Sequence, residues 1–128
     1  MAMNVLVVDD SAVMRGMIRK ALQQSGLALE SLLEAGDGEA ALRVMHETRV
    51  DVALVDLNMP VMDGEEMIGH MRQDGQLRDI PVLVVSTDSS PARMSRLATS
   101  VTGFIHKPFT PEALSGRIIE LIGASQGV

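Results

Sequence analysis

The sequence contains no cysteine, tryptophan or tyrosine, and phenylalanine occurs only twice. The lack of cysteine excludes a disulfide scaffold, a thiolate zinc site and a cysteine nucleophile, and it is compatible with a reducing compartment. Two phenylalanines are too few for the stacking platforms of single-stranded nucleic acid binders. Basic residues are also in the minority, because 11 Lys and Arg stand against 17 Asp and Glu, for a net charge of −6. This acidic balance argues against a nucleic-acid partner.

Long apolar runs and targeting signals are absent as well. No segment approaches the ~20 apolar residues of a membrane span. The apolar start, Met1 to Val8, lacks the basic residues and the small-residue cleavage site of a signal peptide. A chain of 128 residues matches one ordinary domain, which buries roughly two thirds of its unfolded surface. We therefore expect a single domain over residues 1–128, in a soluble, cytoplasmic and monomeric protein without a membrane partner.

What the sequence does contain is an alternation of short apolar runs with longer amphipathic stretches. Uninterrupted runs of Val and Leu are typical of strands buried on both faces. The runs are Met3–Val8, Val52–Val55 and Val82–Val85, with weaker ones at Ser31–Leu33 and Gly103–His106. Helical stripes fall between them at Ser11–Ser25, Glu39–Thr48 and Glu65–Asp74, with two more helices opening at Ser90-Pro91 and Thr110-Pro111.

Several side chains on these helices have expected places. We expect five methionines on the apolar stripes to fill the core: Met14, Met17, Met45, Met67 and Met71. The last helix is predicted to carry Leu114, Ile118, Ile119 and Ile122 on one face. The helix from Ser90-Pro91 through Leu97 is predicted to be short, about 8 or 9 residues, and marginal by itself. Its Arg93 and Arg96 are expected on a solvated face.

Five strand–helix units predict an α/β fold. Right-handed crossovers place helices on both faces of a parallel sheet. The predicted architecture is flavodoxin-like, (βα)5 and doubly wound, with a five-stranded parallel sheet in the order 2-1-3-4-5.

Polar residues follow the carboxyl ends of four predicted strands, where ligands bind in such sheets. They are Asp9 and Asp10, then Asp56, then Ser86 and Thr87, and finally Lys107. A lone aspartate there is most often a cap or turn residue, so the joint placement carries the argument. Three carboxylates with one lysine call for a hard divalent cation, which we expect to be Mg²⁺, with Mn²⁺ as a chemical substitute.

This set of residues predicts phosphoryl chemistry. Asp56 ends a buried strand and heads a loop, so it is the best candidate for a nucleophile that forms an aspartyl phosphate. Lys107 and the cation would neutralise the charge of the phosphoryl group, and Thr87 could donate a hydrogen bond to it.

At this point the chain resembles a known family, the receiver domains of two-component response regulators, over residues 3–123. The matching motifs are Val5-Leu-Val-Val-Asp-Asp-Ser11, Asp56-Leu-Asn-Met-Pro-Val-Met-Asp-Gly64, Val84-Val-Ser-Thr87 and Lys107-Pro-Phe109. Within the family the chain is most similar to stand-alone chemotaxis receivers of the CheY type. Departures include Phe104, where many relatives have Tyr, and Ser100-Val101, where many have Gly-Ala.

The resemblance implies a role for each matching residue. Asp56 would be the phosphoacceptor, and Asp10, Asp56 and the backbone carbonyl of Asn58 would bind Mg²⁺ directly. Asp9 would act on the metal through water. Lys107, in a cis Lys107–Pro108 peptide, would pair with a phosphoryl oxygen. Thr87 and Phe104 would be the switch residues, and positions 58 and 89 would tune the lifetime of the phosphoryl group.

The implied function is that of a signalling switch. A histidine kinase of the CheA type would donate the phosphoryl group, and the receiver would catalyse only this transfer and its own later dephosphorylation, with a phosphatase as a further partner. The surface of the fourth helix, fifth strand and fifth helix would then change its affinity for a target such as a flagellar motor switch protein. The length leaves no room for an output domain, so we expect the output to be protein binding.

Several alternatives remain open at this point. The chain could act as a phosphate sink, or be cut from a longer regulator. A Mg²⁺-dependent aspartyl phosphatase of the haloacid dehalogenase type would want an acid where Asn58 stands, and it would need more chain. An unphosphorylated scaffold is disfavoured by the complete set of Asp10, Asp56, Thr87 and Lys107.

Overall fold

The computed structural model describes residues 2–88 and 90–125, with side chains through residue 121. The strands are β1 (Met3–Val8), β2 (Leu29–Ala35), β3 (Val52–Val55), β4 (Val82–Ser86) and β5 (Gly103–His106). The helices are α1 (Ala12–Gln23), α2 (Gly38–Glu47), α3 (Gly64–Gln73), α4 (Pro91–Leu97) and α5 (Pro111–Ser125). Strands and helices alternate along the chain, as the sequence predicts.

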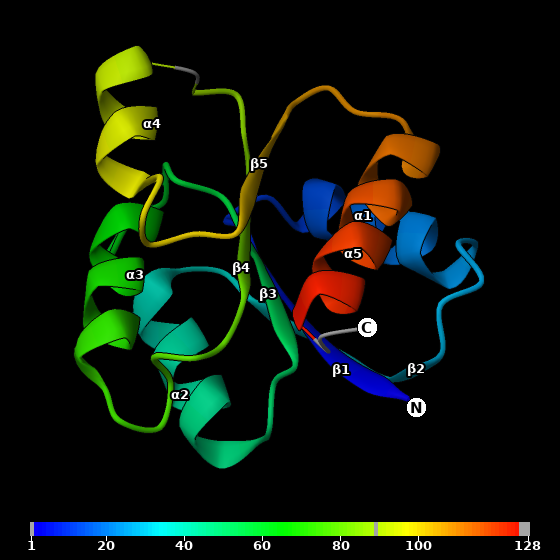
Figure 1. Ribbon diagram of the computed structural model, residues 1–128, viewed down its shortest axis with the longest axis horizontal. Coiled ribbons are helices and arrows are strands. Elements are labelled where there is room, and N and C mark those ends of the chain that lie inside the picture. The colour runs from blue at the N-terminus through cyan, green and yellow to red at the C-terminus, as the bar shows by residue number, and fades with distance from the viewer. Residues whose placement is uncertain (1, 89, 126–128) are drawn as a thin grey trace.

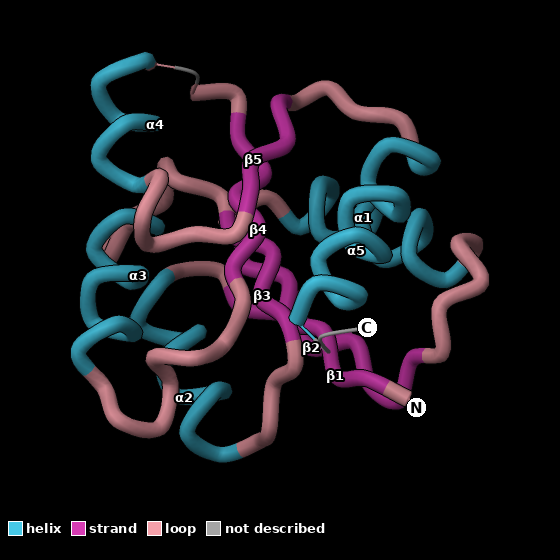
Figure 2. The backbone as a smooth tube through the Cα atoms, in the orientation of Figure 1, coloured by secondary structure: helices cyan, strands magenta, loops and turns pink. Residues whose placement is uncertain are grey.

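The five strands form one parallel sheet in the order β2-β1-β3-β4-β5. Figures 1 and 2 show the sheet between two helical layers, with α2, α3 and α4 on one side and α1 and α5 on the other. The predicted doubly wound, flavodoxin-like fold is therefore confirmed. Among the described residues, the helices are all too short or too polar to cross a membrane.

The core is split by the sheet into two hydrophobic clusters. Alternate residues of β1 enter them: Val5 and Val7 pack on the side of α1 and α5, while Leu6 and Val8 pack on the side of α2 and α3. Because both faces are covered, all six residues of β1 are buried. Each buried Val or Leu side chain contributes roughly 1.5–3 kcal/mol on burial, which explains why the central strands are rich in these residues.

Most helices begin at a side chain that caps them. The caps accept hydrogen bonds from backbone N–H groups three residues ahead: Ser11 from Met14, Asp37 from Ala40, Asp63 from Glu66 and Thr110 from Ala113, at 2.8–3.1 Å. Such a cap stabilises a helix by about 1 kcal/mol. Because Asp37 and Asp63 are the caps, α2 and α3 begin one residue earlier than the apolar stripes indicate.

The fourth helix differs from its prediction. It has seven residues rather than about eight or nine, and Ser90 makes no capping hydrogen bond through its side chain. Pro91 at the first helical position fixes the start instead. Ser89, a predicted tuning position, lies outside the described residues.

Parts of the predicted core also need correction. Met17 and Val13 are 53% and 75% exposed, so the prediction that Met17 fills the core is wrong. In α1 the buried residues are Ile18, Ala21 and Leu22, a narrower stripe, because only one side of the helix meets the sheet. Similarly, Leu114 and Ile118 of α5 are buried, whereas Ile119 is 52% exposed. The side chain of residue 122 lies outside the described part.

The second strand is longer than its apolar run. β2 covers seven residues and includes the polar Glu30 and Glu34. It lies at the sheet edge and pairs only with β1, so alternate side chains can reach solvent. Glu34 forms ion pairs with Arg15 and Arg19 of α1, which compensate its charge.

Candidate functional site

Three aspartates meet where the central strands end. β1 and β3 are neighbours, and Val8 pairs with Val55, so the residues that follow these strands come together. The Asp56 N–H donates to the Val8 carbonyl at 2.9 Å. One carboxylate oxygen from each of Asp9, Asp10 and Asp56 lies within 4.8 Å of the others. Asp9 and Asp56 are only 2% and 7% exposed, whereas Asp10 is exposed.

Lys107 brings a positive charge into contact with this cluster. It follows β5, and its Nζ lies 2.7 Å from Asp9 Oδ2 and 3.7 Å from Asp56 Oδ2. The Lys107–Pro108 peptide is cis. Asp9 also accepts a hydrogen bond from the Ser11 N–H at 2.9 Å. In this arrangement Lys107 lies closer to Asp9 than to Asp56, and the Asp56 carboxylate also accepts hydrogen bonds from the Ser86 side chain and the Leu57 backbone.

The electrostatic balance of the site leaves Asp56 short of positive charge. Burial raises the pKa of the Asp56 carboxyl, Lys107 lowers it, and the nearby Asp9 raises it again, so that the pKa lies above its usual value. One ammonium therefore does not compensate the aspartates. The donors are all oxygen atoms, which suits a hard divalent cation such as Mg²⁺ and not zinc.

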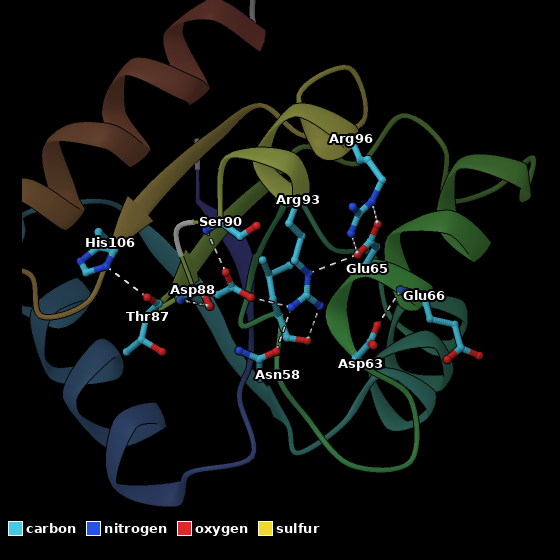
Figure 3. Close-up of polar contacts among 12 residues, drawn as sticks. Asn58, Asp63, Glu65, Glu66, Thr87, Asp88, Ser90, Arg93, Arg96 and His106 are labelled. Atoms are coloured by element: carbon cyan, nitrogen blue, oxygen red, sulfur yellow. Dashed lines mark hydrogen bonds and ion pairs between the residues drawn. The ribbon is translucent and has the colours of Figure 1, made fainter.

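The hydroxyl residues lie at the end of β4, next to this cluster in the sheet order. Ser86 is buried, and its Oγ accepts from the Asp88 N–H at 3.2 Å. Thr87 is exposed in the loop that follows. His106 Nε2 lies 3.1 Å from the Thr87 carbonyl oxygen. Figure 3 marks this contact with a dashed line. This contact ties the loop after β4 to the end of β5.

Phe104 lies apart from the carboxylates. It is half-buried on β5, where it pairs with Val84, and its ring packs on the hydrophobic cluster that also contains Leu97, Met94 and Val101. The ring therefore packs on the same side of the sheet as Leu97 and Met94 of α4.

Asn58 lies in the loop after β3, two residues beyond Asp56, and its side chain has a partner that the sequence did not predict. Asn58 Oδ1 accepts from Arg93 Nη1 at 2.9 Å. Arg93 also pairs with Asp88 and Glu65, and its side chain is only 15% exposed. The prediction of a solvated face is therefore wrong for Arg93, whereas Arg96 is 58% exposed and pairs with Glu65 at the surface.

Nothing in the sequence spacing indicates the Arg93 contacts. Arg93 and its partners Asn58 and Glu65 are 35 and 28 residues apart, and neither pair belongs to one helix or one strand pair. Charge is the feature of the sequence that could have indicated them. Asp88 directly follows Thr87, and an acid at the rim of an acidic site requires a compensating cation.

The comparisons with known proteins agree with one another. Residues 5–119 match the family model of the response regulator receiver domain. The chain is 34% identical to a chemotaxis protein CheY homolog of Campylobacter jejuni over 98% of this chain and 96% of that one. It is also 34% identical to chemotaxis protein CheY1 of Helicobacter pylori, over 96% and 99% of the two chains.

Solved structures give the same result. The chemotaxis protein CheY4 of Vibrio cholerae superimposes with a TM-score of 0.85 at 34% identity, covering 94% of this chain and 99% of that one. A phosphorylated cyanobacterial phytochrome response regulator, RcpA, superimposes with a TM-score of 0.80 at 25% identity, covering 96% and 92%.

Proposed function

The chain belongs to the response regulator receiver domain family, and we propose that it is a single receiver domain which accepts a phosphoryl group on Asp56. Receivers of the chemotaxis type are phosphorelay signalling switches and not conventional enzymes. The observation that carries the proposal is the buried Asp56 carboxylate, which lies within 4.8 Å of Asp9 and Asp10 and 3.7 Å from Lys107 Nζ.

The metal belongs to this proposal. Asp10, Asp56 and the backbone carbonyl of Asn58 would hold Mg²⁺ directly, and Asp9 would hold it through water. When bound, the ion neutralises the carboxylates and the negative charge of the transferring group. The all-oxygen donor set and the raised pKa of Asp56, caused first by burial, support this assignment.

The side chains then have distinct tasks. An Asp56 oxygen attacks phosphorus, forming a P–O bond while the P–N bond of a kinase phosphohistidine breaks. Lys107 Nζ pairs with a phosphoryl oxygen and so compensates its charge. Thr87 donates a hydrogen bond to another phosphoryl oxygen. The loop that carries Thr87 moves with it, and the Phe104 ring takes up the space that this movement opens.

The output is a shift between two populated conformations. Phosphorylation favours the conformation in which Thr87 contacts the phosphoryl group. A ligand or modification must prefer one state by several kcal/mol to move such an equilibrium far. In the favoured state the surface of α4, β5 and α5 presents a different shape to a binding protein.

The partners follow from the family. We assign phosphoryl donation to a histidine kinase of the CheA type, and output to a protein target such as a flagellar motor switch protein, in a cytoplasmic monomer. A phosphatase is a further partner of the phosphorylated form. The chemotaxis proteins of Campylobacter jejuni and Helicobacter pylori support this pathway, and RcpA, solved in a phosphorylated form, supports the modification.

Intact mass spectrometry tests the proposal. After incubation with Mg²⁺ and acetyl phosphate, wild type should gain about 80 Da, the mass of one phosphoryl group. Asp56→Asn should not gain it, Asp10→Asn should gain it much more slowly, and Asp79→Asn, an exposed control, should behave as wild type.

Three results would contradict the proposal. An adduct that persists in Asp56→Asn would place the phosphoryl group elsewhere. Rapid hydrolysis of many phosphate esters would indicate a phosphatase. No adduct, together with no change in the NMR spectrum on addition of beryllium fluoride, would indicate an unphosphorylated scaffold.

A further inference from the structure

Arg93 of α4 joins the two loops that border the Asp56 site. Its Nη1 lies 2.9 Å from Asn58 Oδ1 and 2.8 Å from Asp88 Oδ2, while its Nε lies 3.2 Å from Glu65 Oε1. A longer contact of 3.4 Å leads from Nη2 to the Leu57 carbonyl oxygen. Figure 3 shows the guanidinium at the centre of these groups. One side chain thus connects α4 with α3, with the loop after β3 and with the loop after β4.

The partners of Arg93 are themselves fixed. Asp88 Oδ1 accepts from the Ser90 N–H at 2.9 Å. Glu65 receives two hydrogen bonds from Arg96, at 3.0 and 3.2 Å. Because Asp88 and Glu65 are each held from a second side, the guanidinium has little freedom to turn. A planar fork with five N–H donors can serve several acceptors at once, which the single ammonium of lysine cannot do in the same geometry.

The charges of this group are balanced. Two arginines, Arg93 and Arg96, face two acids, Asp88 and Glu65. Asp88 directly follows Thr87 and carries a negative charge at the rim of a site that is already acidic. Arg93 compensates that charge. Solvent screens this ion pair only partly, because the Arg93 side chain is 15% exposed. Without it, Asp88 would add to the repulsion that an incoming anionic phosphoryl donor meets.

We propose that Arg93 is a positioning residue for phosphorylation: it holds Asn58 beside Asp56 and neutralises Asp88 beside Thr87. The inference rests on the proposed function for the role of these neighbours. Since Asn58 contributes its backbone carbonyl to the proposed metal site, a restraint on its side chain also restrains the segment that carries this carbonyl. Since Asp88 directly follows Thr87 in the chain, a restraint on the Asp88 carboxylate limits how far the loop that carries Thr87 can move.

The first test compares Arg93→Gln with Arg96→Gln. Both variants remove one arginine from the same helix and from the same acid, Glu65, but only Arg93 hydrogen-bonds to Asn58 and Asp88 among the described residues. We expect Arg93→Gln to slow phosphorylation by acetyl phosphate about tenfold or more, which corresponds to about 1.4 kcal/mol. Arg96→Gln should stay within about twofold of wild type, in keeping with an exposed ion pair.

Rescue variants separate positioning from general damage to the fold. The charge-balanced double variant Arg93→Gln with Asp88→Asn should recover much of the rate, because it removes the uncompensated carboxylate. Arg93→Lys should also recover part of the rate, because it keeps the charge beside Asp88, but not all of it, because it loses the fork that reaches Asn58 and Glu65 together. A role limited to packing α4 predicts no rescue by Asp88→Asn, and that result would overturn the proposal.

A readout without phosphoryl donor keeps the inference separate from the proposed function. Hydrogen exchange of residues 57–65 in the metal-free protein should be faster in Arg93→Gln than in Arg96→Gln or wild type. If wild type proves not to be phosphorylated on Asp56 while this difference is present, the proposed function fails and the positioning of Asn58 stands. If the two arginine variants exchange alike, the positioning role is refuted whatever the phosphorylation assay gives.

Discussion

Gly64 lets the first turn of α3 lie directly against the strand end that carries Asp56. Its N–H donates to the Leu57 carbonyl at 2.9 Å. A Cβ added to Gly64 would lie 2.3 Å from the Asp56 carbonyl oxygen and 3.0 Å from Leu57 Cα. Both are backbone atoms, which no side-chain rotation can move away. We therefore predict that Gly64→Ala displaces α3 from the phosphoacceptor strand.

The size of the effect follows from this overlap. Real Cβ atoms essentially never come closer than 3.0 Å to another heavy atom, so backbone has to shift by about 0.7 Å, and shifts of this kind cost about 1–3 kcal/mol. Against this, replacing glycine in a helix by alanine stabilises by up to about 1 kcal/mol. The expected net result for Gly64→Ala is a loss of about 1–2 kcal/mol in the free energy of unfolding.

Gly69 is a matched control in the same helix. It is exposed, and an added Cβ there would have nothing within 4 Å, so Gly69→Ala should stabilise by about 0.5–1 kcal/mol. Urea unfolding followed by far-UV circular dichroism measures both variants, because the sequence has no Trp or Tyr for fluorescence. In thermal unfolding followed by the same signal, the two variants should differ by roughly 10 °C in Tm. A Gly64→Ala protein as stable as wild type would refute the steric argument.

Three further predictions concern stability. Val61 is 75% exposed and has a φ of +66°, a backbone conformation that is strained for valine but tolerated by asparagine. Val61→Asn should therefore raise the free energy of unfolding in urea by about 1 kcal/mol, and an unchanged value would contradict the strain at this position. Burial raises the pKa of Asp56 above 3.8 in the folded protein. Ionisation of Asp56 therefore lowers the free energy of unfolding as the pH rises above that value. In EDTA, Asp56→Asn should be more stable than wild type near neutral pH, and the difference should disappear at about pH 4 and below. A difference that grows in acid would contradict this prediction. The buried Met67→Ala should lose about 2–5 kcal/mol in the same urea assay, while the exposed Met17→Ala should change by less than about 0.5 kcal/mol, and equal losses would contradict the burial of either residue.

The fold could be predicted from the sequence because each level of pattern pointed to the same answer. Apolar runs marked β1, β3 and β4 almost to the residue, since strands buried on both faces leave no polar interruptions. The edge strand β2 was predicted too short, since Glu30 and Glu34 reach solvent there. On α1 the periodicity gave the helix but not the angle at which it meets the sheet, so Met17 was assigned to the core although it is exposed.

The contacts of the candidate site also fall into two groups, those that the sequence predicts and those that it does not. Topology alone brings Asp9, Asp10 and Asp56 together, because residues that follow neighbouring parallel strands must meet at one edge. No comparable rule places Arg93 beside Asn58, because that contact depends on the rotamer of a long side chain on a short helix. Backbone geometry is predictable from periodicity, whereas a side chain that spans two loops is found only once the loops are in place.

The charge balance of the two groups explains their different roles. Three carboxylates with one ammonium, that of Lys107, leave two negative charges uncompensated inside the site, so the folded chain stores repulsion that a cation relieves on binding. In the neighbouring group two arginines compensate two acids, and no ligand is needed. The aspartate cluster therefore favours binding of a cation, whereas the arginine group stabilises the loops around it. Arg93 belongs to the arginine group and contacts the loop that follows Asp56. Mg²⁺ should therefore raise the Tm of wild type and of Arg96→Gln alike, but not that of Asp56→Asn. A similar rise in all three proteins would mean that the ion binds elsewhere.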